Sequence, residues 1–593
     1  MPSASAPINR RGSMQDESVK FHARDFLSVK QEDLLADYEM GDVLGEGGFG
    51  LVYSCVHRET GAERAVKMLQ KDPDRPQIQA NIINEFNVLK DLDHPNLVKV
   101  YDLYQDEECF FIVTDLYMGG DVFDVLEEKG PLSEEDAAVV MNNLLGCVNY
   151  FHKRNLVHRD LKPENILLDA KQSYSDIKVI DFGLARYTKE FGDELRGLVG
   201  SAYYVAPQVI EGDYTHKCDL WSCGVIAYAL ISGFAPFDAS TDGAVLELVY
   251  DGRYDFDDEE WDPISELAKD FITQLLEYDE ADRPSAEEAL QHPWLRRCRK
   301  SPRMNNALVR SNSRNSLRDL SKFESKSNKL KQAACAMIAS QLLTNEEKEL
   351  VDDAFRALDK SCQGEITKKD LNSSFVDLFG DDSSDEEDGS DDDEDMDQSQ
   401  ASHAELVDNI FEQVNFSGSG AIQYSEFAVV MILEKNMVTD DKLRACFKFF
   451  DLDDKGFIGK EDVGAVLKLG NRGCHKIMQM TASGRKRDKI TFDDFKKCIL
   501  PERPQKPSGP PKRGLLGDDN KNFKGPLGGP MDESSRARRP SFMDEESSRR
   551  RGPMDESSRR TKLGRSNVGP SATTRIGPAK KINRLASLEE VKE

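Results

Sequence analysis

The feature that most constrains this chain is a glycine-rich turn placed between two strand-like segments. Residues 45–50 read GEGGFG, a GxGxxG pattern. The pattern also fits a dinucleotide-binding turn, but there the third glycine opens a helix. Here residues 51–56 continue as a strand, and residues 65–69 form a second strand pattern after a short turn. The order predicts a flap between antiparallel strands, whose backbone N–H groups can approach phosphate oxygens closely.

Charged residues follow this flap at positions suited to a nucleotide. Lys67 lies in the second strand and would reach phosphate oxygens as a point charge. Glu85, in a helical run over residues 82–91, is the candidate that would fix its position. The nucleotide-binding candidates are Leu44, Gly45, Gly47, Gly48, Gly50, Val52, Lys67, Asp115 and Asp121.

Two polar motifs follow in a fixed order. The letters HRDLKPEN surround Asp160, and DFG begins at Asp181. Phosphoryl transfer needs positioning and charge neutralisation more than covalent chemistry. Asp160 suits the orientation of a substrate hydroxyl, and Lys162 can neutralise charge on the moving group. Asn165 and Asp181 supply oxygen ligands suited to Mg²⁺.

This ordered set of motifs resembles the eukaryotic protein kinase family over residues 38–297. The resemblance implies a bilobal α+β fold, ATP and Mg²⁺ as cofactors, and catalytic roles for Asp160, Lys162, Lys67 and Glu85. The KPE letters after the catalytic aspartate resemble serine/threonine kinases. A non-catalytic kinase-like scaffold with a partner-binding module is the alternative, and the intact motifs favour the enzyme.

One position departs from the family pattern. Gln208 stands where the family usually carries a glutamate, and Arg283 matches the usual partner of that glutamate. A neutral acceptor forms a weaker hydrogen bond than a carboxylate. We therefore expect a less stable C-terminal lobe without loss of chemistry.

The activation segment between Gly183 and Gly200 has few hydroxyls. Only Tyr187 and Thr188 could accept a phosphate there. Arg159, just before the catalytic aspartate, calls for an anionic partner. We hypothesise that a carboxylate replaces the phosphate, the candidates being Glu190, Asp193 and Glu194. A solvated charged loop is the alternative.

Two carboxylates indicate the kind of substrate. Asp121 and Glu164 are expected near the peptide groove, where they would favour Arg or Lys upstream of the acceptor serine. The chain itself contains R-x-x-S sites at Ser13, Ser313, Ser541 and Ser587. Autophosphorylation and modification by another kinase with the same preference both fit these sites.

Residues 320–342 combine lysines with apolar side chains at helical spacing. This pattern predicts a basic amphipathic helix of the kind that calmodulin-like lobes bind. A plain packing helix is the alternative. We treat residues 298–345 as a basic autoinhibitory junction.

Four further segments fit the 12-residue calcium loop of EF-hands, at residues 359–370, 415–426, 451–462 and 483–494. Calcium requires six or more oxygen ligands, several of them charged. The candidate ligands are Asp359, Ser361, Gln363 and Asp370 in the first loop and Asp451, Asp453 and Asp462 in the third.

Each loop nevertheless lacks ligands. Lys455 occupies position five of the third loop, Asn415 opens the second, and Arg485 and Arg487 lie in the fourth. We expect weak Ca²⁺ or Mg²⁺ binding at the first or third loop, less at the second, and none at the fourth. The fourth loop fits a role in packing alone.

The order of kinase, basic junction and four EF-hand-like units resembles the calcium-dependent protein kinases of plants and protists over residues 38–500. The letters LSKF from Leu320 and IASQL from Ile338 match that family's junction. The resemblance implies an all-α calmodulin-like domain at residues 346–500 that captures the junction when calcium binds. The incomplete loops predict weak or partial calcium control.

Charge is distributed unevenly along the 593 residues. The formal net charge is −29, which argues against a nucleic-acid or membrane-surface role for the folded body. We expect the acidic insert at residues 381–397 to be a solvated spacer. The alternatives are that it holds the basic junction or raises the local cation concentration. Residues 501–593, with 21 Lys and Arg against 13 Asp and Glu, form a basic tail with short repeats.

The remaining expectations concern order, location and assembly. We expect residues 1–37 to be a flexible arm and residues 501–593 to be disordered, because neither can bury enough apolar area. Apolar runs are too short for a membrane helix, and no leader or anchor is expected. Eleven scattered cysteines suggest a reducing compartment. We expect a cytoplasmic monomer, with access to the nucleus left open.

Overall fold

The structure is a computed structural model of the chain. It describes residues 29–31, 33–47, 50–169, 174–190, 192–299, 307–323, 329–379, 405–482 and 488–500, which all belong to one compact unit. Several expectations lie outside these residues: the arm up to residue 28, Gly48, the acidic insert at 381–397, Arg485 and Arg487, and the tail at 501–593.

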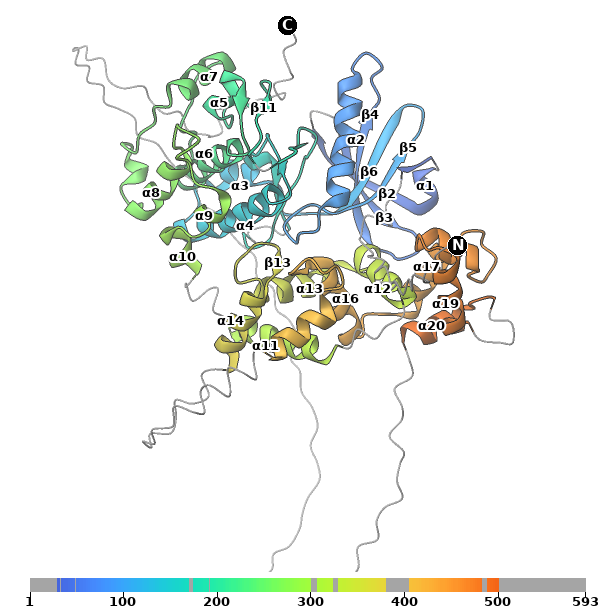
Figure 1. Cartoon of the computed structure of the whole chain (residues 1–593). Coiled ribbons are helices and arrows are strands. Elements are labelled where there is room, and N and C mark those ends of the chain that lie inside the picture. The colour runs from blue at the N-terminus through green and yellow to red at the C-terminus, as the bar shows by residue number, and fades with distance from the viewer. Residues whose placement is uncertain are drawn as a thin grey trace, which may run out of the picture. The chain divides into compact units, whose positions relative to one another are not determined.

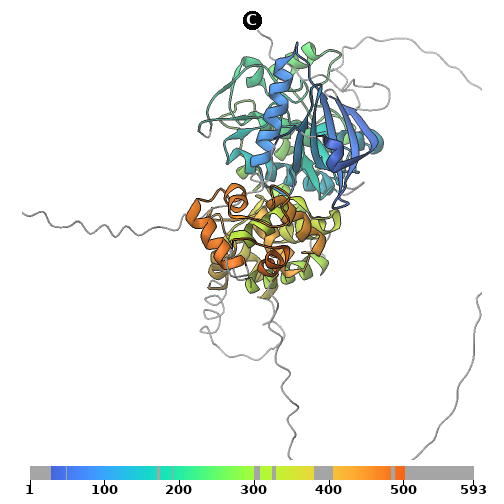
Figure 2. The ribbon, with the colours of Figure 1, turned by 90° about the vertical axis from the view of Figure 1, so that its right-hand side faces the viewer.

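A six-stranded sheet forms the N-terminal lobe, in the order β1-β5-β6-β4-β3-β2 (Figure 1). Its strands are β1 (Val29–Lys30), β2 (Tyr38–Gly47), β3 (Gly50–His57), β4 (Glu63–Gln70), β5 (Val100–Gln105) and β6 (Cys109–Asp115). Helix α2 (Pro76–Asp91) lies beside the sheet (Figure 2), and its Ile82, Phe86 and Leu89 are buried in the same core as Leu69 and Phe110. The predicted flap is therefore the turn between β2 and β3.

The sheet begins earlier than the expected boundary at Tyr38. Val29 and Lys30 pair in parallel with Leu103 and Tyr104 of β5, and helix α1 (Leu34–Asp37) follows. The Lys30 ammonium lies 3.0 Å from Asp102. Residues 29–37, which we expected in the flexible arm, thus belong to the N-terminal lobe. A two-residue strand has too little periodicity to be read from sequence.

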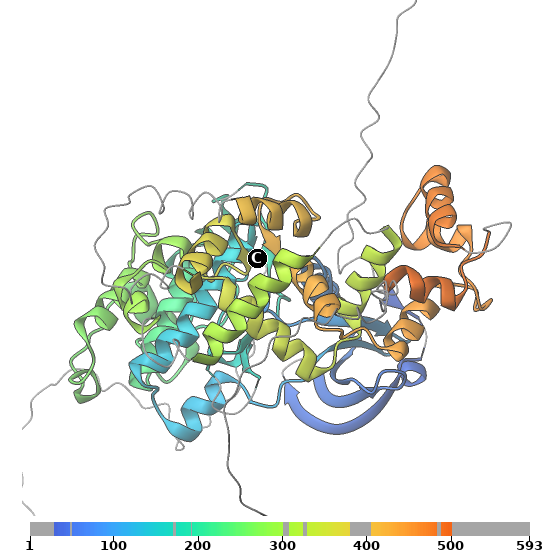
Figure 3. The same ribbon diagram turned by 90° about the horizontal axis from the view of Figure 1, so that it is seen from below.

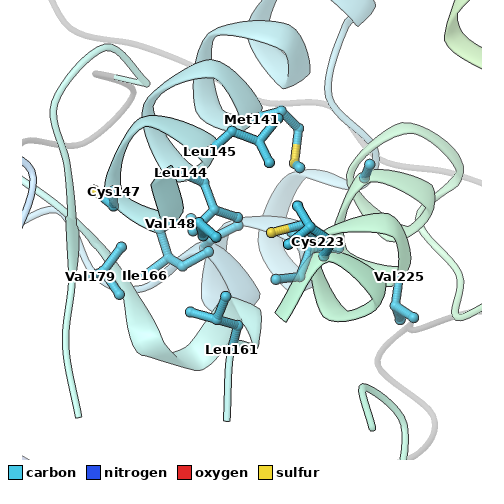
Figure 4. Close-up of a cluster of buried hydrophobic side chains, with 14 of the residues drawn as sticks. Met141, Leu144, Leu145, Cys147, Val148, Leu161, Ile166, Val179, Cys223 and Val225 are labelled. Carbon is cyan, nitrogen blue, oxygen red and sulfur yellow. The ribbon is translucent and has the colours of Figure 1, made fainter. Parts of the chain in front are cut away.

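The C-terminal lobe is built from helices around a strongly apolar core. The helices are α3 (Val122–Lys129), α4 (Glu134–His152), α5 (Pro207–Glu211), α6 (Cys218–Ser232), α7 (Asp242–Asp251), α8 (Glu266–Leu275), α9 (Ala286–Ala289) and α10 (Pro293–Arg299). Helix α6 is buried along its whole length, as an apolar helix without a polar face must be. Figure 4 shows α4 residues such as Leu144 and Val148 beside Leu161 and Ile166. This core fixes the segment that carries Asp160.

Three short antiparallel pairs shape the loops around that segment. Strand β7 (Leu156–Val157) pairs with β10 (Arg186–Tyr187), and β8 (Ile166–Leu168) pairs with β9 (Ile177–Val179). Strand β11 (Leu195–Arg196) pairs with β12 (Asp213–Tyr214). Both ends of the activation segment are therefore tied to the C-terminal lobe by backbone hydrogen bonds.

The junction forms two helices where we expected one over residues 320–342. Helix α11 (Ala307–Lys322) ends before the buried Phe323, and α12 (Lys329–Gln341) follows. The apolar face of α12, including Leu330, Met337 and Ile338, is buried in the regulatory core. The expectation that helical lobes bind the junction is met by α12.

The regulatory region consists of paired helix–loop–helix units, as expected (Figure 3). Its helices include α13 (Asn345–Leu358), α14 (Lys368–Phe379), α16 (Tyr424–Glu434), α17 (Asp440–Phe450), α18 (Lys460–Val466), α19 (Asn471–Thr481) and α20 (Phe492–Ile499), and residues 405–414 before the second loop are also helical. Strand β13 (Glu365–Ile366) pairs with β14 (Ile422–Gln423), which joins the first and second loops. Ile458 and Ile490 exchange backbone hydrogen bonds of 2.9 and 3.0 Å, which join the third and fourth. Within the described part of the chain, no helix is long and apolar enough to span a membrane.

Candidate active site and regulatory contacts

The flap and the lysine that follows it are held by the sheet register. Gly45 lies opposite Val52, and Val52 lies opposite Lys67 on the next strand. Gly50 has φ +156°, and a Cβ there would lie 1.9 Å from the carbonyl oxygen of Met68. Only glycine therefore fits at the first residue of β3, where the backbone lies close to β4.

Lys67 and Glu85 form the expected ion pair. The Lys67 ammonium lies 3.4 Å from both carboxylate oxygens of Glu85, which α2 supplies from a buried position. Burial lowers the pKa of Lys67, but the charges of Glu85 and Asp181 outweigh it and raise the pKa overall. The lysine is therefore charged and held in place by Glu85.

The carboxylate of Asp160 is held on both oxygens. Ser201 donates to Oδ1 at 2.8 Å, and the Lys162 ammonium lies 3.1 Å from Oδ2. The side chain of Asn165 donates to the Asp160 carbonyl at 2.8 Å. Sequence reasoning chose Asp160, Lys162 and Asn165 as site residues but did not include Ser201, although its hydroxyl stands where the kinase family usually has a threonine after Gly200.

Asp181 is the second acidic residue of this site, and the charges of Lys67 and Lys162 act on it. Burial raises its pKa, but Lys67 and Lys162 outweigh that effect and lower the pKa, so the carboxylate is ionised. The next residue, Phe182, is buried and packs edge-on against His158, with 4.6 Å between ring centroids. This contact links the two motifs that the sequence separates.

A buried carboxylate that sequence reasoning missed anchors the catalytic loop. Asp219, at the start of α6, accepts hydrogen bonds from the backbone N–H groups of His158 and Arg159 at 2.9 Å each. His152 lies 2.8 Å from the same carboxylate. Asp219 thereby fixes the backbone just before Asp160.

The two acidic candidates of the nucleotide site use their side chains elsewhere. Asp121 caps α3 by accepting from the Asp124 amide at 2.8 Å. Asp115 accepts hydrogen bonds from Tyr101 at 2.5 Å and Tyr117 at 3.0 Å, and it pairs with Lys348 of the regulatory region. Burial raises the pKa of Asp115, but the charges of Lys348 and Arg64 outweigh this effect and hold the pKa well below its usual range. Any nucleotide contact of Asp115 would therefore fall to its backbone.

The hypothesis that a loop carboxylate pairs with Arg159 is wrong. The guanidinium donates to the Leu184 carbonyl at 2.8 Å and to the Tyr214 hydroxyl at 3.0 Å. Asp193 instead accepts from the amides of Lys189 and Glu190, at 3.0 and 2.8 Å. Its carboxylate is used to close a local turn.

Gln208 contacts Arg283, as expected. The buried Arg283 donates to the Gln208 side-chain oxygen at 3.0 Å, and the Gln208 amide donates to the Tyr278 carbonyl at 2.5 Å. Burial lowers the pKa of Arg283 to about 10, and the charges of Cys218 and Glu280 offset this only in part. A glutamate would supply the charge but would lose the bond to Tyr278.

The first calcium loop brings its two acids together. Ser361 donates to Asp359 and lies equally close, 3.2 Å, to Asp370. Burial and then the charge of Asp370 raise the pKa of Asp359 to about 7. Two buried acids that share the Ser361 hydroxyl as a partner suit a cation, so the residues of this loop fit a bound cation.

The other loops differ from the first. In the second, Glu426 accepts from the amides of Ser417 and Gln423, at 2.6 and 2.9 Å. In the third, the Lys455 ammonium lies 2.8 Å from Asp453 and 3.2 Å from Asp462. Part of the fourth loop lies outside the described residues. Within the described ranges, the parts of these loops included, no group of three or more His, Cys, Asp or Glu side chains could hold a metal.

Helix α13 contacts the kinase through a row of alternating charges. Lys348 pairs with Asp115, Asp352 lies 3.2 Å from Lys178, and Arg356 lies 2.8 Å from Asp176. Tyr424 also donates to Asp352. Burial raises the pKa of Asp176, but Lys178 and Arg356 lower it to about 2. The spacing of four residues places all three helix charges on one face.

The first calcium loop also packs directly on the kinase. Gly364, at position six with φ +72°, leaves no room for a Cβ, which would lie 1.8 Å from the His94 ring. Gly146 of α4 also leaves no room for a Cβ, because that atom would lie 2.4 Å from the carbonyl oxygen of Cys362. Lys153 donates to Gln363 at 3.0 Å. Residues 362–364 therefore depend on two glycines for their contact with the kinase.

Comparison with known proteins identifies the family. The family model "Protein kinase domain" matches residues 38–295. Calcium-dependent protein kinase 4 of Plasmodium falciparum is 34% identical over 465 residues, covering 77% of this chain and 85% of that protein. Calcium-dependent protein kinase 7 of Arabidopsis thaliana is 30% identical over 520 residues, covering 83% and 91%. This chain is therefore a serine/threonine protein kinase and belongs to the calcium-dependent protein kinase family.

Proposed function

We propose that this kinase phosphorylates serine or threonine preceded by basic residues, under weak or partial calcium control. Bound Mg-ATP would supply the phosphoryl group, with Asn165 and Asp181 as metal ligands and Lys67 on the phosphates. Asp160, held between Ser201 and Lys162, would orient the substrate hydroxyl. The cytoplasmic location and the monomeric state stay predictions.

The observation that supports the basic preference is a set of carboxylates around Tyr204. Burial raises the pKa of the Tyr204 hydroxyl well above its usual range, and the charges of Glu164, Asp160 and Asp121 raise it further. Three carboxylates therefore lie close enough to act on the Tyr204 hydroxyl. Such a field favours arginine or lysine in a bound peptide.

We expect a serine peptide with arginine three residues upstream to have about tenfold higher kcat/KM than its alanine counterpart. Glu164→Gln should remove most of this difference, because the arginine loses a charged partner. Steady-state kinetics with both peptides would measure it, with Glu127→Gln on the exposed side of α3 as the matched control. Equal kcat/KM for the two peptides with wild-type enzyme would contradict the proposal.

Weak calcium control is supported by Lys455 in the third loop. Its ammonium lies between Asp453 and the buried Asp462, where a calcium ion would have to bind. A cation inside the ligand set repels a second one and occupies its ligands. The first loop, whose two acids face each other, is then the better calcium site.

Lys455→Asp should create a calcium site in the third loop. The change removes the internal cation and adds a carboxylate at position five, so calorimetric titration should find one more bound Ca²⁺ per chain than in wild type. Lys460→Asp makes the same charge change outside the ligand positions and should add none. If the Asp453→Asn variant binds one Ca²⁺ fewer than wild type, the third loop of the wild-type protein already binds calcium, and the proposal is wrong.

A further inference from the structure

Arg159 connects three parts of the active site through hydrogen bonds. Its backbone N–H is held by Asp219 at 2.9 Å, and its φ of +70° turns the chain sharply before Asp160. Its guanidinium reaches the Leu184 carbonyl, just after the DFG motif, and the Tyr214 hydroxyl. The conformation of Arg159 therefore bears on Asp160 and on the segment that follows Asp181.

Tyr214 is placed to hold this arginine rigidly. It is 1% exposed, and it pairs with Leu195 across the β11–β12 ladder, so the activation segment fixes it from one side. Burial raises the pKa of its hydroxyl despite the charge of Arg159, so the phenol is neutral. The cation thus has two neutral acceptors, a carbonyl and a phenol, in a low-dielectric setting where each bond is strong.

The hydroxyl of Thr188 is used in a different place. Thr188 donates through both its Oγ1 and its backbone N–H to the Asn155 carbonyl, at 3.2 and 2.8 Å. This contact follows directly on the pairing of Tyr187 with Leu156 between β10 and β7. A phosphate on Thr188 would have to break these bonds before it could reach Arg159.

We propose that Tyr214 is a positioning residue for phosphoryl transfer, acting through Arg159 in the place that a phosphate or a carboxylate of the activation segment would otherwise fill. The Tyr214 phenol fixes the Arg159 guanidinium. The guanidinium in turn fixes the backbone just before Asp160 and, through the Leu184 carbonyl, the backbone after Asp181. The enzyme then has an ordered active site without modification of its activation segment.

Tyr214→Phe tests the proposal because it removes one oxygen and keeps the ring. The expected result is a kcat about tenfold lower, the loss typical of one hydrogen bond to a charged group, with KM for ATP and the melting temperature close to wild type. Arg159→Lys should lower kcat similarly, and adding Tyr214→Phe to it should lower kcat no further. Tyr187→Phe, on the exposed tyrosine of the same segment, is the matched control and should leave kcat unchanged.

Three results would overturn the proposal. The first is a Tyr214→Phe enzyme with wild-type kcat. The second is a loss in kcat that adds to the loss caused by Arg159→Lys, since the effects of independent sites are additive. The third is a Thr188→Ala or phosphatase-treated enzyme that has lost its activity, because the activation segment would then need its phosphate. Wild-type kcat in both of these preparations, together with the Tyr214→Phe loss, would support it.

Discussion

Replacing Asp160 by asparagine is expected to lower kcat for peptide phosphorylation by about 10²–10⁴-fold. Asparagine keeps the shape and can still accept the hydrogen bond from Ser201, but it has neither the charge nor the basicity of the carboxylate. The pair with Lys162, now 3.1 Å from Asp160, would lose its electrostatic attraction. Single-turnover kinetics would isolate the chemical step from product release.

Nucleotide affinity separates this effect from misfolding. Lys67 and Asp181 do not contact Asp160 directly, so the dissociation constant of a fluorescent ATP analogue should stay within about threefold of wild type. Asp251→Asn on the exposed end of α7 is a matched control and should keep full activity. Undiminished kcat in Asp160→Asn would indicate a contaminating kinase or a non-catalytic scaffold.

Asp352→Asn is expected to destabilise the contact between the regulatory region and the kinase by about 3 kcal/mol. Asp352 and Lys178 are 3% and 2% exposed in their side chains, so the change leaves a buried lysine with less compensating charge. Asp176, 3.0 Å from the same lysine, compensates in part. Thermal unfolding of the full chain should show a lower first transition, because the regulatory region separates from the kinase more easily.

The neighbouring residue provides the control. Asp353 is 54% exposed, and its one ion pair among the described residues is with Arg356 on its own helix, so Asp353→Asn should change stability by less than about 0.5 kcal/mol. The double variant Lys178→Met with Asp352→Leu should recover much of the loss, since a buried ion pair can be replaced by apolar side chains of similar size. Equal effects of Asp352→Asn and Asp353→Asn would contradict this view of the contact.

The catalytic residues could be predicted from sequence because each lies in a short contiguous motif. Lys67, Asp160, Asn165 and Asp181 can each be found from a few neighbouring residues. The strands and loops that carry them are likewise short segments with their own sequence patterns. The helix–loop–helix units could be predicted for the same reason, since a glycine at position six recurs in the first three loops and an isoleucine at position eight recurs in all four.

The contacts between distant segments could not be predicted. Lys348, Asp352 and Arg356 recur every four residues, a spacing that is equally typical of pairs within one helix. Their partners lie more than 170 residues away in the sequence. Tyr214 likewise gives no sign in the sequence that its hydroxyl faces Arg159. Such pairings depend on the tertiary fold, and local patterns do not specify it.

Asp115 ends β6 at the point where the chain leaves the N-terminal sheet for α3, and its carboxylate holds Lys348 of the regulatory region. One side chain therefore belongs both to the connection between the lobes and to the regulatory contact. Linkage then requires the influence to be mutual. The factor by which the docked regulatory region changes the affinity for nucleotide is the factor by which nucleotide changes docking. A change in nucleotide affinity upon docking would therefore appear equally as a change in docking upon nucleotide binding.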